Sequence, residues 1–240
     1  MAQGFFQHIP NINYDFKSDG KFFQAKDLFR KVSVWSYLRE GISGYNYYRI
    51  GDGERPDTIA ARLYGDSTLY WTFFLVNENL QDYNDWPKSQ THLHRYITRK
   101  YSGTVLKASS STDIVSSTSK FLLGEKVTQS TTDAFGFVTK VDPTHNRIIL
   151  NSVSGTFTTD AVVGSDSEKS MTPSSVLVEK DDVHHYTNSE GLKTTVSTNN
   201  TPVSNEVYER DLNEDRFLIR YIEPKYIGDV IDEFKEIIRD

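Results

Sequence analysis

The pattern of apolar and polar positions changes several times along the chain, beginning with a segment that has no stable period. From Phe5 to Phe23, aromatic residues are scattered among Asn, Asp, Gly and Ser, which predicts an extended arm whose rings dock on another surface. Between Asp27 and Arg39, apolar residues recur at spacings of three and four, which predicts a helix with Asp27 as its cap. We interpret residues 1–44 as an N-terminal arm and helix.

Residues 45–101 form the next predicted unit, a strand followed by two helices. Tyr45–Ile50 is an aromatic and β-branched run typical of a strand, and a Gly-Asp-Gly turn follows it. Pro56 suits the first turn of a helix that Gly65 ends. A second helix begins near Ser67 and is apolar or aromatic around almost its whole circumference. Other parts of the protein must therefore cover this helix on several sides.

The rest of the chain divides by composition into four segments. Long Ser and Thr runs predict a linker at residues 102–120, and short β-type runs punctuated by Gly and Asp-Pro predict a small β-barrel-like insert at 121–164. Residues 165–210 are polar and poor in aromatics, which predicts an extended surface segment. Residues 211–240 predict a C-terminal strand and an amphipathic helix with the apolar stripe Ile227, Val230, Ile231, Phe234, Ile237 and Ile238. The expected fold class is α+β.

Composition limits the kinds of partner that the chain can have. With 240 residues, 37% of them hydrophobic and 25% charged, it can bury a core in about one or two domains. A net charge of −6 without a basic stripe argues against nucleic-acid binding, and the absence of cysteine removes disulfides and thiolate metal sites. No stretch approaches the ~18 apolar residues of a membrane span, and the N-terminus lacks the features of a signal peptide. We expect a soluble protein made in the cytoplasm, without membrane insertion.

One segment of the predicted strand-helix-helix unit resembles a known module. Tyr47–Asp66 is similar to a LysM module, in which a short strand leads through a Gly-Asp turn to a Thr-initiated helix carrying Ile-Ala and a Tyr-Gly stop. It differs from the usual glycan-binding form in the inserted Gly53–Pro56 and in the aromatic run Leu69–Phe74.

With these two departures, the segment resembles one family in particular, the small baseplate wedge proteins of T-even-like contractile-tailed phages. The family carries an ordered series of short motifs, which stands here as Arg55-Pro56, Leu63-Tyr64-Gly65, Leu69-Tyr70-Trp71 and Asn77. The resemblance extends over roughly residues 20–101 and includes Asp27–Arg30 upstream and Trp86 downstream.

The family resemblance implies a structural virion protein of the tail baseplate that turns over no substrate and needs no cofactor. It implies six copies per particle, contacts to other wedge subunits and to the sheath initiator, and a clamp that joins neighbouring wedges. Buried Tyr, Trp and Arg supply most of the energy of such interfaces. The candidate interface residues are therefore Arg55, Arg62, Tyr64, Tyr70, Trp71 and Trp86.

Alternative interpretations remain open for these residues and for the whole module. The aromatic residues can fill the module's own core, and the two arginines can be solvated surface charges. A glycosidase would need two carboxylates in a cleft, but Asp52, Asp57 and Asp66 already suit turn and cap positions, and Glu54 is near them only in sequence. His92 with His94 and His184 with His185 are poorly spaced for a metal site. We assign no catalytic, cofactor-binding or metal residue, and the alternative function is a peptidoglycan-binding LysM module of a tail or cell-wall protein.

Overall fold

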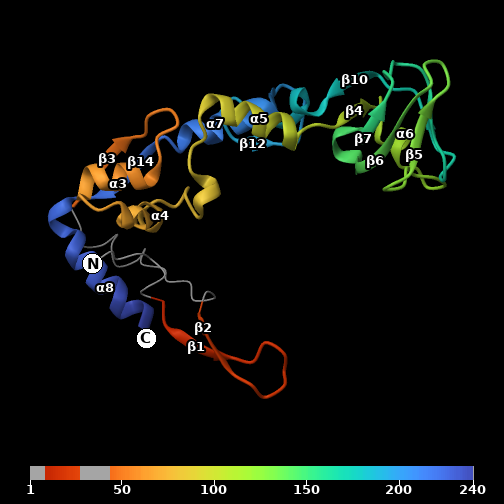
Figure 1. Ribbon diagram of the computed structural model, residues 1–240. Helices are drawn as coiled ribbons and strands as arrows, with labels where there is room; N and C mark the ends of the chain where they lie inside the picture. The colour runs from red at the N-terminus through yellow and green to blue at the C-terminus, as the bar shows by residue number, and fades with distance from the viewer. Residues whose placement is uncertain (1–8, 28–43, 240) are drawn as a thin grey trace. The chain divides into compact units, whose positions relative to one another are not determined.

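A computed structural model describes residues 9–27 and 44–239, and the chain divides into two compact units (Figure 1). Unit 1 is made of Met1–Gln90 and Asn213–Asp240, and unit 2 is Thr91–Leu212. The helix predicted between Asp27 and Arg39 lies almost entirely outside the described residues. Helices and strands are mixed in the chain, in agreement with the predicted α+β class.

Unit 1 is built on a two-stranded sheet whose strands come from distant parts of the sequence. Strand β3 (Tyr45–Arg49) pairs antiparallel with β14 (Leu218–Ile222), so that Tyr47 lies opposite Arg220. Between the two strands in sequence come α3 (Pro56–Tyr64), the 3-10 turn η1 (Ser67–Tyr70), α4 (Trp71–Val76) and the whole of unit 2.

Helix α3 begins and ends where the sequence predicts, whereas the second predicted helix, expected from near Ser67, starts as the 3-10 turn η1 and becomes α-helical only at Trp71. Pro56 occupies the first turn of α3, and Gly65 ends the helix in a left-handed conformation with φ of 74°. The Asp66 carboxylate then accepts a hydrogen bond from the Thr68 N–H and starts η1. Because η1 and α4 follow at once, their aromatic residues meet both α3 and β14.

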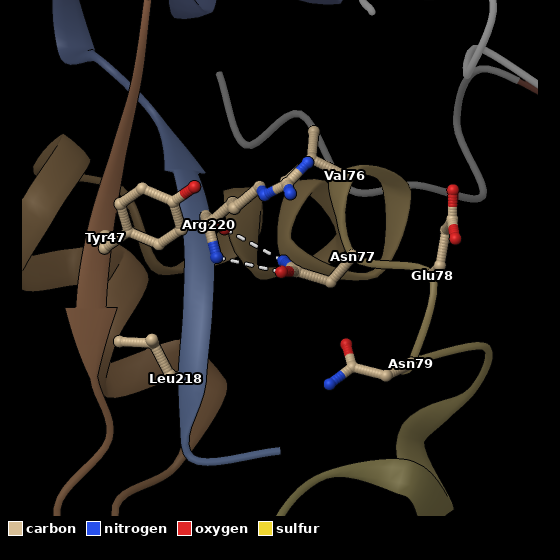
Figure 2. A pocket seen from close by; sticks show the side chains of 7 residues that line it. All are labelled: Tyr47, Val76, Asn77, Glu78, Asn79, Leu218 and Arg220. Carbon is tan, nitrogen blue, oxygen red and sulfur yellow. Dashed lines mark hydrogen bonds between the residues drawn. The ribbon is translucent and has the colours of Figure 1, made fainter. Parts of the chain in front are cut away.

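A buried asparagine ties the end of α4 to the closing strand. The Asn77 side-chain amide donates to the carbonyls of Phe73, at 2.8 Å, and Arg220, at 2.9 Å. Its oxygen accepts the Arg220 N–H at 2.8 Å, as Figure 2 shows. The side chain thus supplies the hydrogen bonds that a third strand would make at the edge of β14.

Two apolar clusters fill unit 1. One contains Ile59, Phe73, Leu80 and Ile219, and lies between the sheet, α3 and α4. In the other, Trp71 of α4 packs on Phe234 of the last helix, α8 (Ile227–Arg239), with ring centroids 4.7 Å apart. The remaining buried positions of α8 are Val230, Ile231 and Ile238. This amphipathic helix, which follows the short turn η5 (Pro224–Tyr226), confirms the predicted stripe, except that Ile237 is exposed.

The described part of the N-terminal arm is a β-hairpin rather than an irregular segment. Strand β1 (Asn11–Tyr14) pairs antiparallel with β2 (Phe23–Lys26). Ile9, just before β1, is buried in the same cluster as α8. The Lys26 ammonium donates to the Ile9 carbonyl at 2.8 Å, which fixes the base of the hairpin.

Unit 2 contains a seven-stranded antiparallel sheet that is curled. The strands are in the order β10-β4-β7-β6-β5-β8-β9, so β9 and β10 lie at opposite edges although only three residues separate them in sequence. Such a connection spans about 14 Å, whereas a flat sheet of this width measures about 29 Å between its outer strands. The sheet must therefore curl. Its strands are β4 (Thr104–Lys107), β5 (Lys126–Gln129), β6 (Ala134–Asp142), β7 (Arg147–Ser154), β8 (Val162–Gly164), β9 (Ser170–Met171) and β10 (Ser175–Val178).

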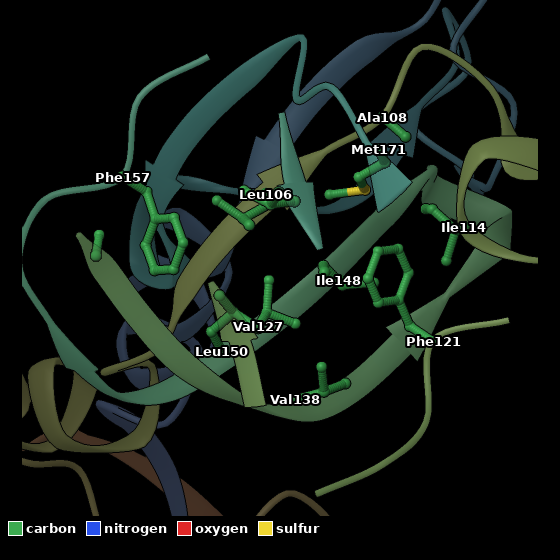
Figure 3. Close-up of a cluster of buried hydrophobic side chains, with 12 residues drawn as sticks. Leu106, Ala108, Ile114, Phe121, Val127, Val138, Ile148, Leu150, Phe157 and Met171 are labelled. Atoms are coloured by element: carbon green, nitrogen blue, oxygen red, sulfur yellow. The ribbon is translucent and has the colours of Figure 1, made fainter. Parts of the chain in front are cut away.

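The inside of the curled sheet is an aliphatic core with two phenylalanines, Phe121 and Phe157 (Figure 3). Residues 102–120 were predicted to form a linker, but they contribute β4 and the short helix α6 (Ser111–Ile114) to this core. The reason is that Leu106 and Ile114 are fully buried, and their burial outweighs the polar composition around them. The barrel-like insert is thus larger than residues 121–164.

The predicted extended segment, residues 165–210, is also structured. It supplies β9, β10, a three-stranded sheet in the order β12-β11-β13, and most of α7. The reason is both apolar and polar: Met171 is buried in the core of the curled sheet, and Asp182 is fully buried and pairs with Lys107 at 2.6 Å and with Arg147. The three strands are β11 (Val183–Thr187), β12 (Lys193–Thr194) and β13 (Thr201–Ser204), and α7 is Asn205–Asp215. The other helix in this part of the chain, α5 (Gln90–Lys100), precedes the curled sheet in sequence. Among the described residues, no helix has the length and apolar character that crossing a membrane requires.

Candidate protein-interface site

Arg62, a predicted interface residue on α3, belongs to a compact polar cluster. Its Nη1 lies 2.7 Å from Glu54 Oε1 and donates to the Tyr48 hydroxyl at 2.6 Å. Glu54 also accepts the Tyr48 hydroxyl, at 2.9 Å, and the Gly51 N–H. Partial burial alone would raise the pKa of Glu54, but its hydrogen-bond donors together hold it below its ordinary value. The cluster keeps this carboxylate ionised and fixes the guanidinium of Arg62, which is still half-exposed.

Arg55, the other predicted arginine, lies at the start of α3 and faces solvent. It makes two hydrogen bonds of 3.1 Å to the Asp57 carboxylate, through Nε and Nη2. An exposed ion pair of this kind contributes little to stability. The pairing does hold the guanidinium in one orientation, which favours recognition by a partner.

The two predicted tryptophans are interior residues. Trp71 is 4% exposed and packs on Phe234, and Trp86 is 8% exposed with its ring near Phe73 and Phe74. The Trp86 Nε1–H donates to the Glu54 carbonyl at 2.8 Å. Burial of both rings within unit 1 leaves almost no side-chain surface for a partner. The alternative assignment of these rings to the module's own core is therefore the one that the contacts favour.

Tyr64 and Tyr70 are half-buried and lie where the two clusters of unit 1 meet. Tyr64 stacks on Phe73 with ring centroids 5.9 Å apart, and Tyr70 meets Phe74 edge-on at 6.5 Å. Burial raises the pKa of Tyr64 to about 12, so its hydroxyl stays protonated at neutral pH. The structure thus brings the six predicted residues into one unit but leaves only the two arginines well exposed.

Sequence reasoning did not single out the outer face of the two-stranded sheet. Tyr47 and Leu218 are exposed there, and the Arg220 guanidinium lies 6.0 Å from the centre of the Tyr47 ring. Together with Val76, Asn77, Glu78 and Asn79, they surround a pocket of about 280 Å³ (Figure 2). The alternation of side chains along a strand could have found this exposed face, because Tyr47 lies two residues from the charged Arg49 and therefore points to the same side of β3.

The hairpin carries the largest group of exposed rings among the described residues. Tyr14, Phe16, Phe22 and Phe23 are all at least half-exposed. The unperiodic aromatic pattern of the N-terminal arm predicted such rings, and their dense spacing in a polar segment is the signal that finds them. A contact with another surface is what the arm was expected to make, and that contact stays a prediction.

The four carboxylates considered for hydrolysis have structural partners in unit 1. Asp52 accepts the Gln90 N–H at 3.0 Å, and Asp66 caps η1. Asp57 pairs with Arg55, as described above, and Glu54 with Arg62. In the described ranges, no group of three or more His, Asp or Glu residues is arranged to hold a metal ion.

The N-terminal part of the chain is similar to a known protein family. Residues 1–107 match a family model described as base plate wedge protein 53. This segment contains the hairpin, α3, α4 and all six predicted interface residues, and the match confirms the predicted resemblance to a baseplate wedge subunit.

A particular relative gives the same result. The chain is 31% identical over 77 residues to "Baseplate wedge protein gp53" of Enterobacteria phage T4. The aligned part is 31% of this chain and 38% of the relative, so the chain spans less than two-fifths of that protein's length.

Proposed function

We propose that the chain is a structural, non-enzymatic subunit of a baseplate wedge in a contractile phage tail, made in the host cytoplasm and located in the virion. The observation that carries this proposal is the match of residues 1–107 to the wedge family, together with the use of its motif residues for packing. Leu69, Tyr70 and Trp71 shape the two clusters of unit 1. A motif series whose residues pack the interior of the module, rather than line a reactive cleft, suits an assembly protein.

Within that function, unit 1 acts as a LysM-like module. Its elements follow the order strand, helix, helix and strand, and the Asn77 side chain joins α4 directly to β14. What separates this module from the predicted continuous one is that unit 2 is inserted between the second helix and the closing strand. The arrangement supports a rigid module that presents its loops and sheet face to partners.

The proposed partners are the other wedge subunits, the neighbouring wedges and the sheath initiator, with six copies of this chain per particle. Arg55 and Arg62 are the predicted residues with the exposure that a contact needs, and their carboxylate partners hold them in place. The four aromatic residues support the surface from beneath, because they pack in the interior of unit 1, to which α3 and its two arginines belong. A bidentate arginine contact to a carboxylate of a partner would add orientation as well as affinity.

The experiment that tests the function is removal of the gene followed by electron microscopy of the products. A wedge-joining subunit predicts free wedge-like pieces and few complete tails, with recovery when the chain is supplied from a plasmid. Complete tails that assemble without the chain contradict the proposal. If such tails also fail only at the cell wall, and the purified chain is retained on isolated sacculi, glycan recognition replaces it.

A further inference from the structure

The curled sheet of unit 2 ends in an unpaired strand edge at β10. The Glu179 N–H donates to the Gly103 carbonyl at 2.8 Å, one residue beyond the β10–β4 ladder. Since opposite residues of antiparallel strands alternate between bonded and non-bonded pairs, Leu177 bonds to β4, whereas Val176 and Val178 direct their N–H and C=O groups away from it. The structure describes every residue of unit 2, and no described residue bonds to these four main-chain groups.

The other edge strands of unit 2 have features that discourage pairing. Proteins protect exposed strand edges by short strands, proline, charged side chains or bulges. Strands β9 and β12 have two residues each, and β13 contains Pro202, which lacks an N–H. Strand β10, in contrast, has four residues, with no proline, charge or bulge among them. Its edge is therefore open to a further strand.

Strand β10 is held in position before any partner arrives. At its start, the Ser174 N–H donates to the Lys107 carbonyl at 2.7 Å. At its end, the Glu179 carbonyl accepts the Asn205 side-chain amide at 2.6 Å, which ties the strand to α7. Between them, Val176 packs against the core of the curled sheet. An edge fixed in this way loses little conformational entropy on binding, so its main-chain groups form a preformed template.

The surroundings of the edge define the chemistry of the partner. The main-chain groups of Val176 and Val178 are complementary to those of an extended chain, which adds to a sheet edge through its own N–H and C=O groups. Val178 is 49% exposed, so an apolar side chain beside it would bury further surface. The charges that follow the strand are engaged within unit 2, because Lys180 pairs with Asp181 and Glu206. The edge therefore fits an uncharged extended segment with apolar side chains.

The size of the edge decides between two sources of such a segment. A stable interface between separate proteins uses about 20–30 residues on each side, and two copies of this chain paired through β10 would supply four each. A segment of another protein in the same particle is kept close by its other contacts, so its effective concentration is high and a short edge is sufficient. The size therefore favours a different protein of the particle over a second copy.

We propose that an extended, uncharged segment of another baseplate protein adds to the curled sheet as a strand beside β10. The proposal rests on the proposed function for the presence of such a protein, but β10 itself lies outside the matched residues 1–107. The added strand bonds to Val176 and Val178 through its main chain. Unit 2 thereby gives the chain an attachment point in addition to the candidate interface residues of unit 1.

Val178→Pro tests the edge by complementation of an extract from cells infected with a phage that lacks this gene, using the purified full chain. Proline removes an outward N–H and is tolerated on an edge strand, so the variant is expected to melt like the unaltered chain. It is expected to restore about tenfold fewer infectious particles, because the added strand loses a hydrogen bond and meets the proline ring. Val178→Thr keeps the N–H and the branched shape, and this matched control is expected to complement fully.

The outcomes separate the inference from the proposed function. Full complementation by Val178→Pro overturns strand addition and leaves the wedge function intact. Failure of the unaltered chain to restore particles overturns the wedge function instead.

Hydrogen exchange of the unaltered chain gives a readout that needs no variant. In the free chain, the amides of Val176 and Val178 are expected to exchange rapidly and that of Leu177 slowly, because only Leu177 bonds to β4. In assembled tails all three amides are expected to be protected. Exchange of Val176 and Val178 that is as fast in tails as in the free chain overturns the proposal.

The source of the added strand is tested with a photoreactive phenylalanine in place of Val178 in assembled tails. A cross-link to another tail protein supports the proposal. A cross-link to a second copy of this chain overturns it.

Discussion

Units 1 and 2 bury their interiors in different ways. Unit 1 has a minimal sheet of two short strands, and aromatic contacts such as Trp71 on Phe234 carry much of its packing. Unit 2 has a broad curled sheet over aliphatic residues such as Leu106 and Ile148, and a buried ionic group, Asp182, joins its parts. The matched family covers most of unit 1 and only the start of unit 2. The aromatic unit therefore carries the wedge resemblance, and most of the curled sheet lies outside the matched residues.

The largest effect is expected from removal of α8 by truncation after Pro224. Val230, Ile231, Phe234 and Ile238 would be lost from the cluster around Trp71, and each buried apolar side chain contributes about 1.5–3 kcal/mol. Unit 1 should then lose its cooperative unfolding transition, whereas unit 2 keeps its own. Differential scanning calorimetry measures both transitions, and an unchanged unit 1 transition would show that α8 is a dispensable tail.

The next largest effect is expected in unit 2 from Asp182→Ala. Removal of one partner leaves the charges of Lys107 and Arg147 without their buried carboxylate, a change that typically costs about 3–5 kcal/mol. Urea unfolding followed by circular dichroism gives the loss. Asp181→Ala, at the exposed neighbouring position paired with Lys180, is the control and should shift the midpoint little. Similar shifts for the two variants would rule out a special role for the buried group.

A smaller effect is expected in unit 1 from Asn77→Ala. The variant loses the hydrogen bonds to Phe73 and Arg220 and leaves the buried edge of β14 without partners, which costs about 1–3 kcal/mol. Asn79→Ala, which removes one exposed bond to the Asp215 carbonyl, is the comparison variant. If the urea midpoints of the two agree, the closing strand does not depend on the Asn77 amide.

The smallest effect is a pH dependence confined to unit 2. Burial lowers the pKa of both His184 and His185 from the ordinary 6.5, and their Nδ1 atoms lie 2.9 Å apart, so one of them must act as acceptor. Nearby Lys193 and Lys100 lower the pKa of His184 further, and Glu209 opposes them. The unfolded chain binds protons more readily than the folded one, so stability is complete above pH 6.5 and falls as the pH drops below it.

Urea midpoints between pH 7.5 and 5 measure this loss. In this range the carboxylates with lowered pKa, such as Asp142, stay ionised and add little. The variant His184→Gln/His185→Gln should flatten the dependence. A dependence that survives the substitution must come from other groups.

The six candidate interface residues show how much of the site could be predicted from the sequence. Their motifs locate the module and point to the family whose model residues 1–107 match, and Arg55 and Arg62 are exposed, which suits both an interface and a solvated surface charge. From the sequence, Trp71 and Trp86 cannot be told apart from exposed anchor residues, but in the structure both are buried. A tryptophan in a short helix is an anchor or a core residue depending on what packs against it. For Trp71 that is α8, more than 150 residues away.

By itself the sequence determined the local elements: Pro56 and Gly65 bound α3, the terminal stripe forms α8, and the motif series indicates the resemblance to baseplate wedge proteins. These features depend on neighbours along the chain, so they can be predicted from spacing and capping. Only the tertiary structure decided that β14 closes the sheet begun by β3, and that residues 102–120 belong to a core. Such pairings depend on groups far apart in sequence, such as Asn77 with Arg220 and Asp182 with Lys107. No local pattern records which distant partner will satisfy a buried strand edge or a buried charge, because the free energy that selects the partner arises only when both are removed from water.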